Sequence, residues 1–253
     1  MNQGDRPVDQ PRRRGVYVLP NLFTTASLFA GFYAVIKAIA GDYQLAASVI
    51  FIAMILDGLD GRIARLTNTQ SDFGAEYDSL ADVIAFGLAP SVVLYLWGLS
   101  GFGKLGWLGA FVFTACGALR LARFNTQVHV ASKSHFQGLP IPAAAATLVG
   151  LVWVAESPEI SGFLDTFAHP IALVLVYMLA LFMVSNFRYK SFKDFDLRGR
   201  VPFVLAVLGV LALALIALHP PLVLFLASLG YALSGPILTL IQRQRRREQR
   251  RTD

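Results

Sequence analysis

The 253-residue sequence is poor in charge and has a single cysteine. Only 15% of its residues are charged, whereas 55% are hydrophobic, and the mean hydropathy is +0.57. So low a charge content excludes an ordinary soluble domain and favours a polytopic membrane protein. The lone cysteine, Cys116, excludes an intrachain disulfide and a cysteine-based metal site, and we expect it to be a small buried hydrophobe.

Long apolar runs dominate the chain, and a run of roughly 20 residues can cross a bilayer as a helix. The predicted fold is therefore all-α, a polytopic integral membrane bundle of about eight transmembrane helices. We expect eight spans, at 20–41, 44–64, 78–99, 105–125, 138–156, 169–187, 201–218 and 221–241.

The basic residues lie almost entirely on one side of these spans. Of the 22 lysines and arginines, only Lys37 and Lys104 fall on the other side. By the positive-inside rule, both termini and the connections after the second, fourth and sixth spans face the cytoplasm. The arginine-rich C-terminal tail could anchor this topology or attract anionic lipid headgroups. Nothing else in the sequence favours nucleic acid.

Four aspartates interrupt the apolar sequence around the cytoplasmic ends of the second and third spans. Asp57 and Asp60 share one helix face, and Asp78 and Asp82 share another. Carboxylates at membrane depth are costly, so four of them predict a site for one or two divalent cations between the two helices. Oxygen ligands favour Mg²⁺, Mn²⁺ or Ca²⁺, and the absence of nearby His or Cys disfavours zinc.

Small residues accompany these acids and leave room for a ligand beside the backbone. They are Gly58, Gly61, Ala64 and Gly74, and Arg65 could meet a phosphate. This combination suits a diphosphate substrate, because two metals can stabilise the attacking and leaving oxygens at phosphorus. Residue types alone also leave open a cation transporter, a proton relay, structural interhelical pairs and a helix-packing role for the glycines.

One motif resembles the signature of the CDP-alcohol phosphatidyltransferases, with all eight fixed positions present: Asp57-x2-Asp60-Gly61-x2-Ala64-Arg65-x8-Gly74-x3-Asp78-x3-Asp82. The resemblance implies a six-helix membrane core that cleaves a CDP-alcohol, releases CMP and transfers the phosphatidyl group to a hydroxyl. It implies that Asp57, Asp60 and Asp78 ligate metal. Asp82 would be a further metal neighbour and the general base.

The same resemblance implies a CDP pocket, formed by Gly61, Ala64, Arg65, Gly74, Asn21 and Thr24. Further blocks resemble the bacterial phosphatidylserine synthase branch of the family, at 20–24, 78–90, 117–125 and 136–145. That branch implies CDP-diacylglycerol and L-serine as substrates and two Mn²⁺ or Mg²⁺ ions. It also implies a homodimer in the bacterial cytoplasmic membrane, with the active site on the cytoplasmic side.

The resemblance divides the chain into a basic tail, a six-helix core, two further spans and a second basic tail, at 1–15, 16–200, 201–241 and 242–253. Arg120, Arg123 and Arg188 stand at cytoplasmic span ends, where they could anchor topology or bind phosphate or an acceptor carboxylate. Asn125 could cap the end of the fourth span. Glycerol 3-phosphate, inositol phosphate or choline as acceptor stays open, as does divalent-cation transport.

Overall fold

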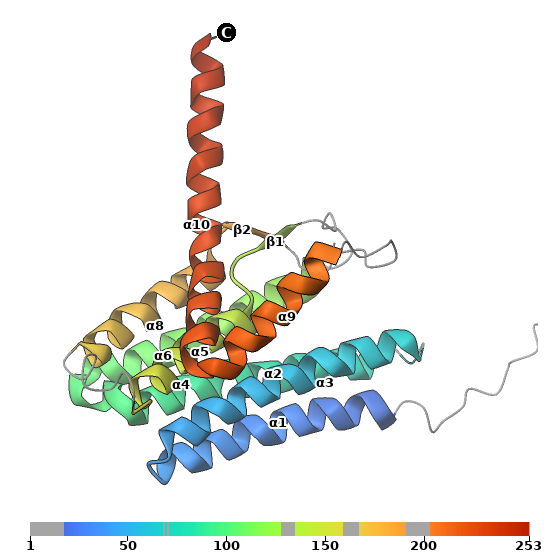
Figure 1. Ribbon diagram of the computed structural model, residues 1–253, viewed down its shortest axis with the longest axis vertical. Coiled ribbons are helices and arrows are strands. Elements are labelled where there is room, and N and C mark those ends of the chain that lie inside the picture. The colour runs from blue at the N-terminus through green and yellow to red at the C-terminus, as the bar shows by residue number, and fades with distance from the viewer. Residues whose placement is uncertain are drawn as a thin grey trace, which may run out of the picture.

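The computed structural model describes residues 18–67, 69, 71–127, 135–158, 167–190 and 203–252. Figure 1 shows a helical bundle from which the last helix extends well beyond the others. The helices are α1 (Val18–Ile39), α2 (Tyr43–Leu66), α3 (Asp72–Asp82), α4 (Ala89–Leu94), α5 (Lys104–Gln127), α6 (Ile141–Ala155), α8 (Ala168–Val184), α9 (Phe203–Leu218) and α10 (Pro220–Thr252).

The prediction of an all-α polytopic membrane bundle is confirmed. Five helical segments in the described part of the chain are long and apolar enough to cross a membrane: Pro20–Ile39, Tyr43–Leu66, Asp72–Phe102, Lys104–Thr126 and Pro220–Ile241. The other three predicted spans correspond to the shorter apolar helices α6, α8 and α9. The protein is therefore an integral membrane protein, with three helices shorter than the sequence predicts.

The third long segment is helical throughout but not uniformly α-helical. A π-helical turn at Val83–Leu88 separates α3 from α4. Pro90 follows at the start of α4 and has no N–H to donate to the preceding turn. The hydroxyl of Thr114 donates to the carbonyl of Gly87 at 3.2 Å, so α5 supplies a partner for the irregular backbone. This agrees with the rule that neighbouring helices satisfy freed backbone groups in membranes.

A close approach between α1 and the π-helical turn depends on a glycine. A Cβ atom added at Gly31 would lie 2.7 Å from the Cα atom of Ala85. Both positions must therefore be small, as is common where membrane helices pack closely. This contact holds α1 beside the segment that carries Asp78 and Asp82.

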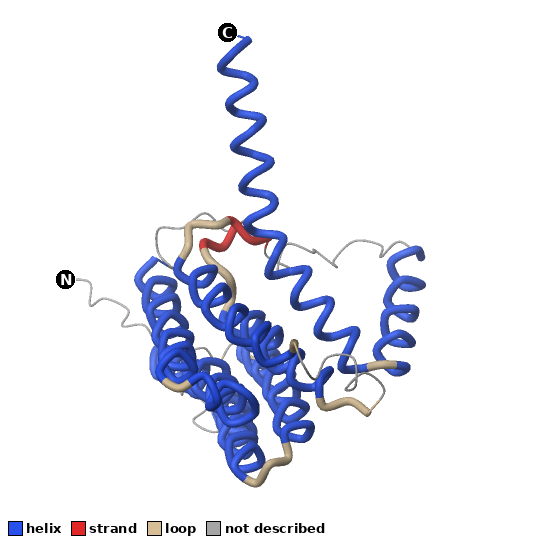
Figure 2. Tube along the Cα trace, turned by 90° about the vertical axis from the view of Figure 1, so that its left-hand side faces the viewer, coloured by secondary structure: helices blue, strands red, loops and turns tan. Residues whose placement is uncertain are grey.

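A short antiparallel strand pair, which the sequence did not predict, joins two connections of the bundle. Strand β1 (His135–Gln137) pairs with β2 (Arg188–Lys190), with Phe136 opposite Tyr189. Strand β1 ends directly before residues 138–140, and β2 begins directly after residues 185–187; the sequence assigned these two segments to the fifth and sixth spans, but they lie outside α6 and α8. Figure 2 shows the pair beside α10, at the point where this helix leaves the bundle.

Tyr189 of β2 fastens α10 to this strand pair. Its side chain is fully buried, and its hydroxyl donates to the carbonyl of Ala232 at 3.0 Å. The ring packs directly against Gly235, where no Cβ could be accommodated without movement. The position of α10 is thus set by two contacts with Tyr189: the hydrogen bond to the Ala232 carbonyl, and a close approach of the ring that only a glycine at position 235 allows.

Candidate active site

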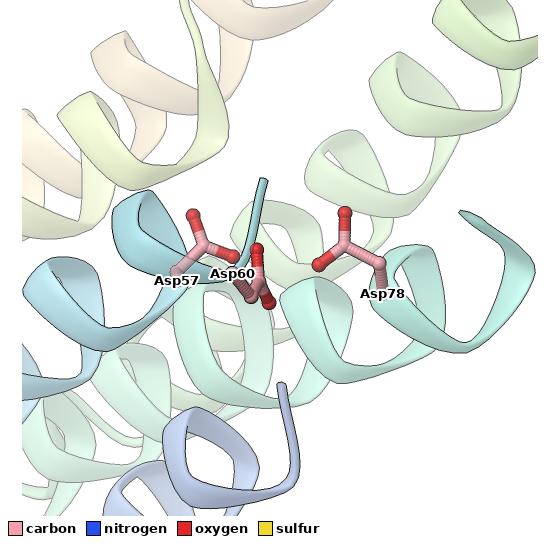
Figure 3. A group of neighbouring side chains, drawn as sticks. All are labelled: Asp57, Asp60 and Asp78. Carbon is pink, nitrogen blue, oxygen red and sulfur yellow. The ribbon is translucent and has the colours of Figure 1, made fainter. Parts of the chain in front are cut away.

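Three aspartates from two helices converge at the cytoplasmic end predicted for the second and third spans. Figure 3 shows Asp57 and Asp60 on α2 pointing toward Asp78 on α3. One carboxylate oxygen from each lies within 4.8 Å of the other two. The spacing of the acids along α2 and the packing of both α2 and α3 against α1 therefore produce the convergence that the sequence predicts.

The start of α3 is defined by a local hydrogen bond. Ser71 is the N-cap, and its Oγ accepts from the backbone N–H of Gly74 at 3.0 Å. Such a cap satisfies one of the free N–H groups of the first turn. It begins the helix so that Asp78 and Asp82 follow on successive turns of one face.

Asp60 is the most buried member of the cluster, with only 5% of its surface exposed. Its Oδ2 accepts a 2.7 Å hydrogen bond from the hydroxyl of Thr24 on α1. The same hydroxyl lies 3.3 Å from the carbonyl of Pro20 in its own helix. The structure thus places Thr24 against a carboxylate, where it can orient the acid for a bound cation.

Asp82 lies next to this group, and its carboxyl is within hydrogen-bonding reach of Asp57. Oδ1 of Asp78 and Oδ1 of Asp82 are both buried without a hydrogen-bond partner within the described part of the chain. Buried carboxylate oxygens are costly when unsatisfied, and clustered negative charges increase that cost. An all-oxygen cluster with unpaired buried oxygens fits a hard divalent cation.

The predicted CDP-pocket residues lie on α1, α2 and α3, the helices that carry or contact the acids. Gly61 lies one turn before Arg65 on α2, and a Cβ atom at Gly61 would be 3.7 Å from Nη1 of Arg65. A Cβ atom at Gly74 would be 3.4 Å from Oδ1 of Asn21. Ala64 is half-buried on the same helix. The structure therefore brings Arg65 to Gly61 and Asn21 to Gly74, and the binding role of these residues remains a prediction.

The three arginines predicted as acceptor or phosphate contacts have different surroundings. Arg120 is 9% exposed and lies over the ring of Phe124, and its Nε is buried without a hydrogen-bond partner among the described residues. Arg123 is exposed and donates to the carbonyl of Val184 at the end of α8, at 3.3 Å. Arg188 is exposed on β2. Of the three, Arg120 is the most buried.

Two polar contacts between helices were not predicted from the sequence. Asn125 does not end its helix, since α5 continues to Gln127. Its Nδ2 instead donates to Oγ of Ser79 on α3 at 2.9 Å, which corrects the predicted capping role. The hydroxyls of Thr25 and Tyr77 lie 2.9 Å apart and join α1 to α3. Neither pair has a sequence signal, because each joins residues far apart in the chain.

The structure is that of an integral membrane protein with a cluster of carboxylates between its helices that could hold a metal ion. A model of the CDP-alcohol phosphatidyltransferase family matches residues 17–185 of the chain. The chain belongs to this family. The matched region contains the eight-position signature, so the resemblance seen in the sequence is confirmed.

The relatives of this chain include both bacterial and archaeal proteins. A CDP-diacylglycerol–serine O-phosphatidyltransferase of Helicobacter pylori is 43% identical over 178 residues, which cover 70% of this chain and 74% of that protein. One of the same name from Methanocaldococcus jannaschii is 39% identical over 166 residues, covering 64% and 73%. An archaetidylserine synthase of Methanothermobacter thermautotrophicus is 32% identical over 173 residues, covering 68% and 69%.

Proposed function

We propose that this protein transfers the phosphatidyl group of CDP-diacylglycerol to the hydroxyl of L-serine and releases CMP. The observation that carries this proposal is the convergence of Asp57, Asp60 and Asp78 within the family core. The acceptor follows from relatives named as serine phosphatidyltransferases at 39% and 43% identity.

In this proposal Asp57, Asp60 and Asp78 hold one or two Mg²⁺ or Mn²⁺ ions, with Asp82 beside them. When bound, such ions stabilise negative charge on the attacking and leaving oxygens of a displacement at phosphorus. The unpaired buried oxygens of Asp78 and Asp82 support this assignment. Thr24 keeps Asp60 in place through its hydrogen bond.

Asp82 is the proposed general base, because a neutral hydroxyl is a weak nucleophile. It accepts the proton of the serine hydroxyl as the serine Oγ forms a bond to the phosphorus that carries diacylglycerol. The bond from this phosphorus to the bridging oxygen breaks, and that oxygen leaves with CMP. The buried Oδ1 of Asp82, without a partner among the described residues, supports its assignment as the proton acceptor.

The CDP pocket would lie on the exposed side of the acids. Gly61, Ala64 and Gly74 leave room for the diphosphate near the backbone, and Arg65 and Asn21 are placed beside two of them. Arg65 is exposed, so its guanidinium is free to meet a phosphate that enters from outside the bundle.

We further propose that residues 16–200 form the catalytic core, with 201–241 as accessory spans and the basic tails outside them. The distribution of basic residues favours a site and both termini on the cytoplasmic side of a bacterial cytoplasmic membrane. There the site could receive a lipid substrate from the bilayer and serine from water. A homodimer is the proposed assembly.

Release of CMP by the purified protein tests the function. Formation of CMP should require CDP-diacylglycerol, L-serine and Mg²⁺ or Mn²⁺ together, with phosphatidylserine as the lipid product. If glycerol 3-phosphate, inositol phosphate or choline released CMP and serine did not, the acceptor would be wrong and the family chemistry would stand. Metal flux into proteoliposomes without CMP formation would favour transport instead.

A further inference from the structure

The acidic cluster is assembled from two helices that hardly pack against each other. Asp57 and Asp60 lie on α2, and Asp78 lies on α3 (Figure 3). Within the described part of the chain, both helices pack chiefly against α1 and make almost no contact with one another. The position of Asp78 relative to the two acids of α2 therefore depends on what holds α3 in place.

Two hydrogen bonds hold α3, and they involve the residues on either side of Asp78. The hydroxyl of Tyr77 lies 2.9 Å from that of Thr25 on α1. Oγ of Ser79 accepts from Nδ2 of Asn125 on α5, also at 2.9 Å. Residues two positions apart on a helix point in nearly opposite directions, so these bonds reach α3 from two sides. Together they restrict both the position and the rotation of the turn that carries Asp78.

Both bonds have a defined direction. The hydroxyl of Thr25 donates to the carbonyl of Asn21 in its own helix at 2.7 Å, so the hydroxyl of Tyr77 is the donor to Thr25. Ser79 likewise donates to a carbonyl of its own helix and accepts from Asn125. A hydroxyl has a single proton to donate and accepts through its lone pairs. Each bond thus ends on a hydroxyl that is itself tied to its own helix.

The residue before Thr25 holds the other helix of the cluster. The hydroxyl of Thr24 donates to Oδ2 of Asp60 on α2 at 2.7 Å. One turn earlier on α1, Oδ1 of Asn21 lies 3.4 Å from the position that a Cβ atom would take at Gly74 of α3. Adjacent residues of α1 therefore bond to α2 and to α3, and α1 sets the spacing between the two helices that carry the acids.

We propose that Tyr77 and Asn125 are positioning residues of the metal site, which hold Asp78 at the distance from Asp57 and Asp60 that a divalent cation requires. The inference rests on the proposed function only in taking Asp78 as a metal ligand. Neither positioning residue belongs to the eight-position signature, so the family motif assigns them no role.

Positioning matters because carboxylates of like charge repel one another, and no close packing between α2 and α3 opposes this repulsion. A bound metal ion accepts a variation of only about 0.2 Å in its ligand distances. If α3 had to be drawn into place when the ion binds, the cost of ordering it would reduce the affinity. A helix that is already held by its neighbours avoids this loss.

Binding of Mn²⁺ to the purified protein in detergent, without substrates, tests the inference. The electron paramagnetic resonance signal of free Mn²⁺ gives the dissociation constant independently of activity. Tyr77→Phe should raise this constant roughly 3- to 10-fold, the size of one hydrogen bond. Ser79→Ala, which removes the acceptor of the Asn125 amide, should have a similar effect. Asp78→Asn should raise the constant much more, which identifies the measured ion as the one bound at this site.

Combined variants distinguish positioning from general damage. Thr25→Val removes the acceptor of the Tyr77 hydroxyl, so adding it to Tyr77→Phe should cause little further loss. Thr25→Ser keeps the hydroxyl and should bind Mn²⁺ as the wild type does. The pair Tyr77→Phe and Ser79→Ala removes both bonds and should bind Mn²⁺ more weakly than either single variant.

Tyr43→Phe is the matched control. The hydroxyl of Tyr43 also joins α2 to the third long segment, by donating to the carbonyl of Leu96 at 3.1 Å. This bond lies at the opposite end of α2 from the acids. Its loss should leave the Mn²⁺ dissociation constant unchanged, whatever its effect on the melting temperature.

The outcomes separate this inference from the proposed function. If the wild type bound no Mn²⁺, or if Asp78→Asn left the constant unchanged, the metal site would fail and this inference with it. If the wild type bound Mn²⁺ and both Tyr77→Phe and Ser79→Ala bound it equally well, the positioning role would be overturned and the metal site would stand. An equal loss in Tyr43→Phe would also overturn the role, because it would show a general effect of stability. The measurement involves no acceptor, so failure of serine as the acceptor would leave the inference intact.

Discussion

The hydroxyl of Thr24 on α1 donates a 2.7 Å hydrogen bond to Oδ2 of Asp60 on α2. The bond uses one lone pair of a buried carboxylate, one of whose oxygens lies within 4.8 Å of a carboxylate oxygen of Asp57 and of Asp78. Through it, a helix that contributes no acid to the cluster determines how one of the acids is oriented.

Replacement of Thr24 by valine should therefore weaken metal binding without removing a proposed ligand. We expect roughly a tenfold higher Mn²⁺ or Mg²⁺ concentration for half-maximal CMP release, the cost typical of a lost support for a metal ligand. Thr24→Ser should retain most of the affinity. The control is Thr147→Val, which removes a buried hydroxyl bonded only to the carbonyl of Ala143 in its own helix. An unchanged metal requirement in Thr24→Val would contradict the supporting role.

Two of the aspartates should respond differently to the same substitution. Asp82→Asn should lower kcat by about 10²–10⁴-fold, as expected when a general base is lost, while CDP-diacylglycerol still binds. Asp78→Asn should also weaken the metal-dependent binding of that substrate. Turnover and equilibrium binding of CDP-diacylglycerol, measured with and without Mn²⁺, distinguish the two. Wild-type activity in Asp82→Asn would remove its assignment as base.

A single methyl group at Gly61 should block the ligand while leaving the protein stable. A Cβ atom there meets only Nη1 of Arg65, at 3.7 Å, so the fold can accept it. Alanine is also favoured over glycine in a helix by about 1 kcal/mol. Gly61→Ala should thus keep or raise the unfolding temperature and increase the KM for CDP-diacylglycerol.

Gly58 provides the matched control on the same helix, because a Cβ atom there has nothing within 4 Å. Gly58→Ala should likewise keep or raise the unfolding temperature, and it should leave the KM for CDP-diacylglycerol close to that of the wild type. If Gly61→Ala were as active as Gly58→Ala, the space beside Gly61 would not hold the diphosphate.

A methyl group added at Gly31, where α1 contacts Ala85, should lower the stability of the protein. An added Cβ atom would lie 2.7 Å from a backbone atom, so α1 would have to move away from the π-helical turn. We expect Gly31→Ala to destabilise the protein by roughly 1–3 kcal/mol, the usual cost of overpacking. Gly230→Ala on α10, with nothing within 4 Å, should not destabilise it. Thermal unfolding in detergent measures both, and equal melting temperatures would show that the bundle absorbs the extra methyl.

The acidic cluster could be predicted from the sequence because its geometry is mostly local. Asp57 and Asp60 share a face by helical periodicity alone, and so do Asp78 and Asp82. The long-range requirement was that the acid-bearing ends of the second and third spans come together, which they do because α2 and α3 both pack against α1. The family match confirmed what this spacing indicated.

The boundaries of the fifth and sixth spans were less accurate because hydropathy does not detect short strands. The apolar residues Leu139 and Phe187 lie just outside α6 and α8, so hydropathy extends both helices too far. In the structure Gly138 adopts φ 79°, and its N–H donates to the carbonyl of Phe187 at 2.9 Å. This pairing depends on two segments that lie about fifty residues apart in the sequence, which no local pattern reports.

By itself, the sequence determined the membrane class, the family and the four aspartates, because hydropathy, charge and helical spacing are properties of neighbouring residues. Only the tertiary structure decided which other side chains reach these acids. It placed Thr24 of α1 against Asp60 of α2. The reason is physical: polar groups in an apolar bundle must find partners on other helices, and these partners depend on how the helices pack.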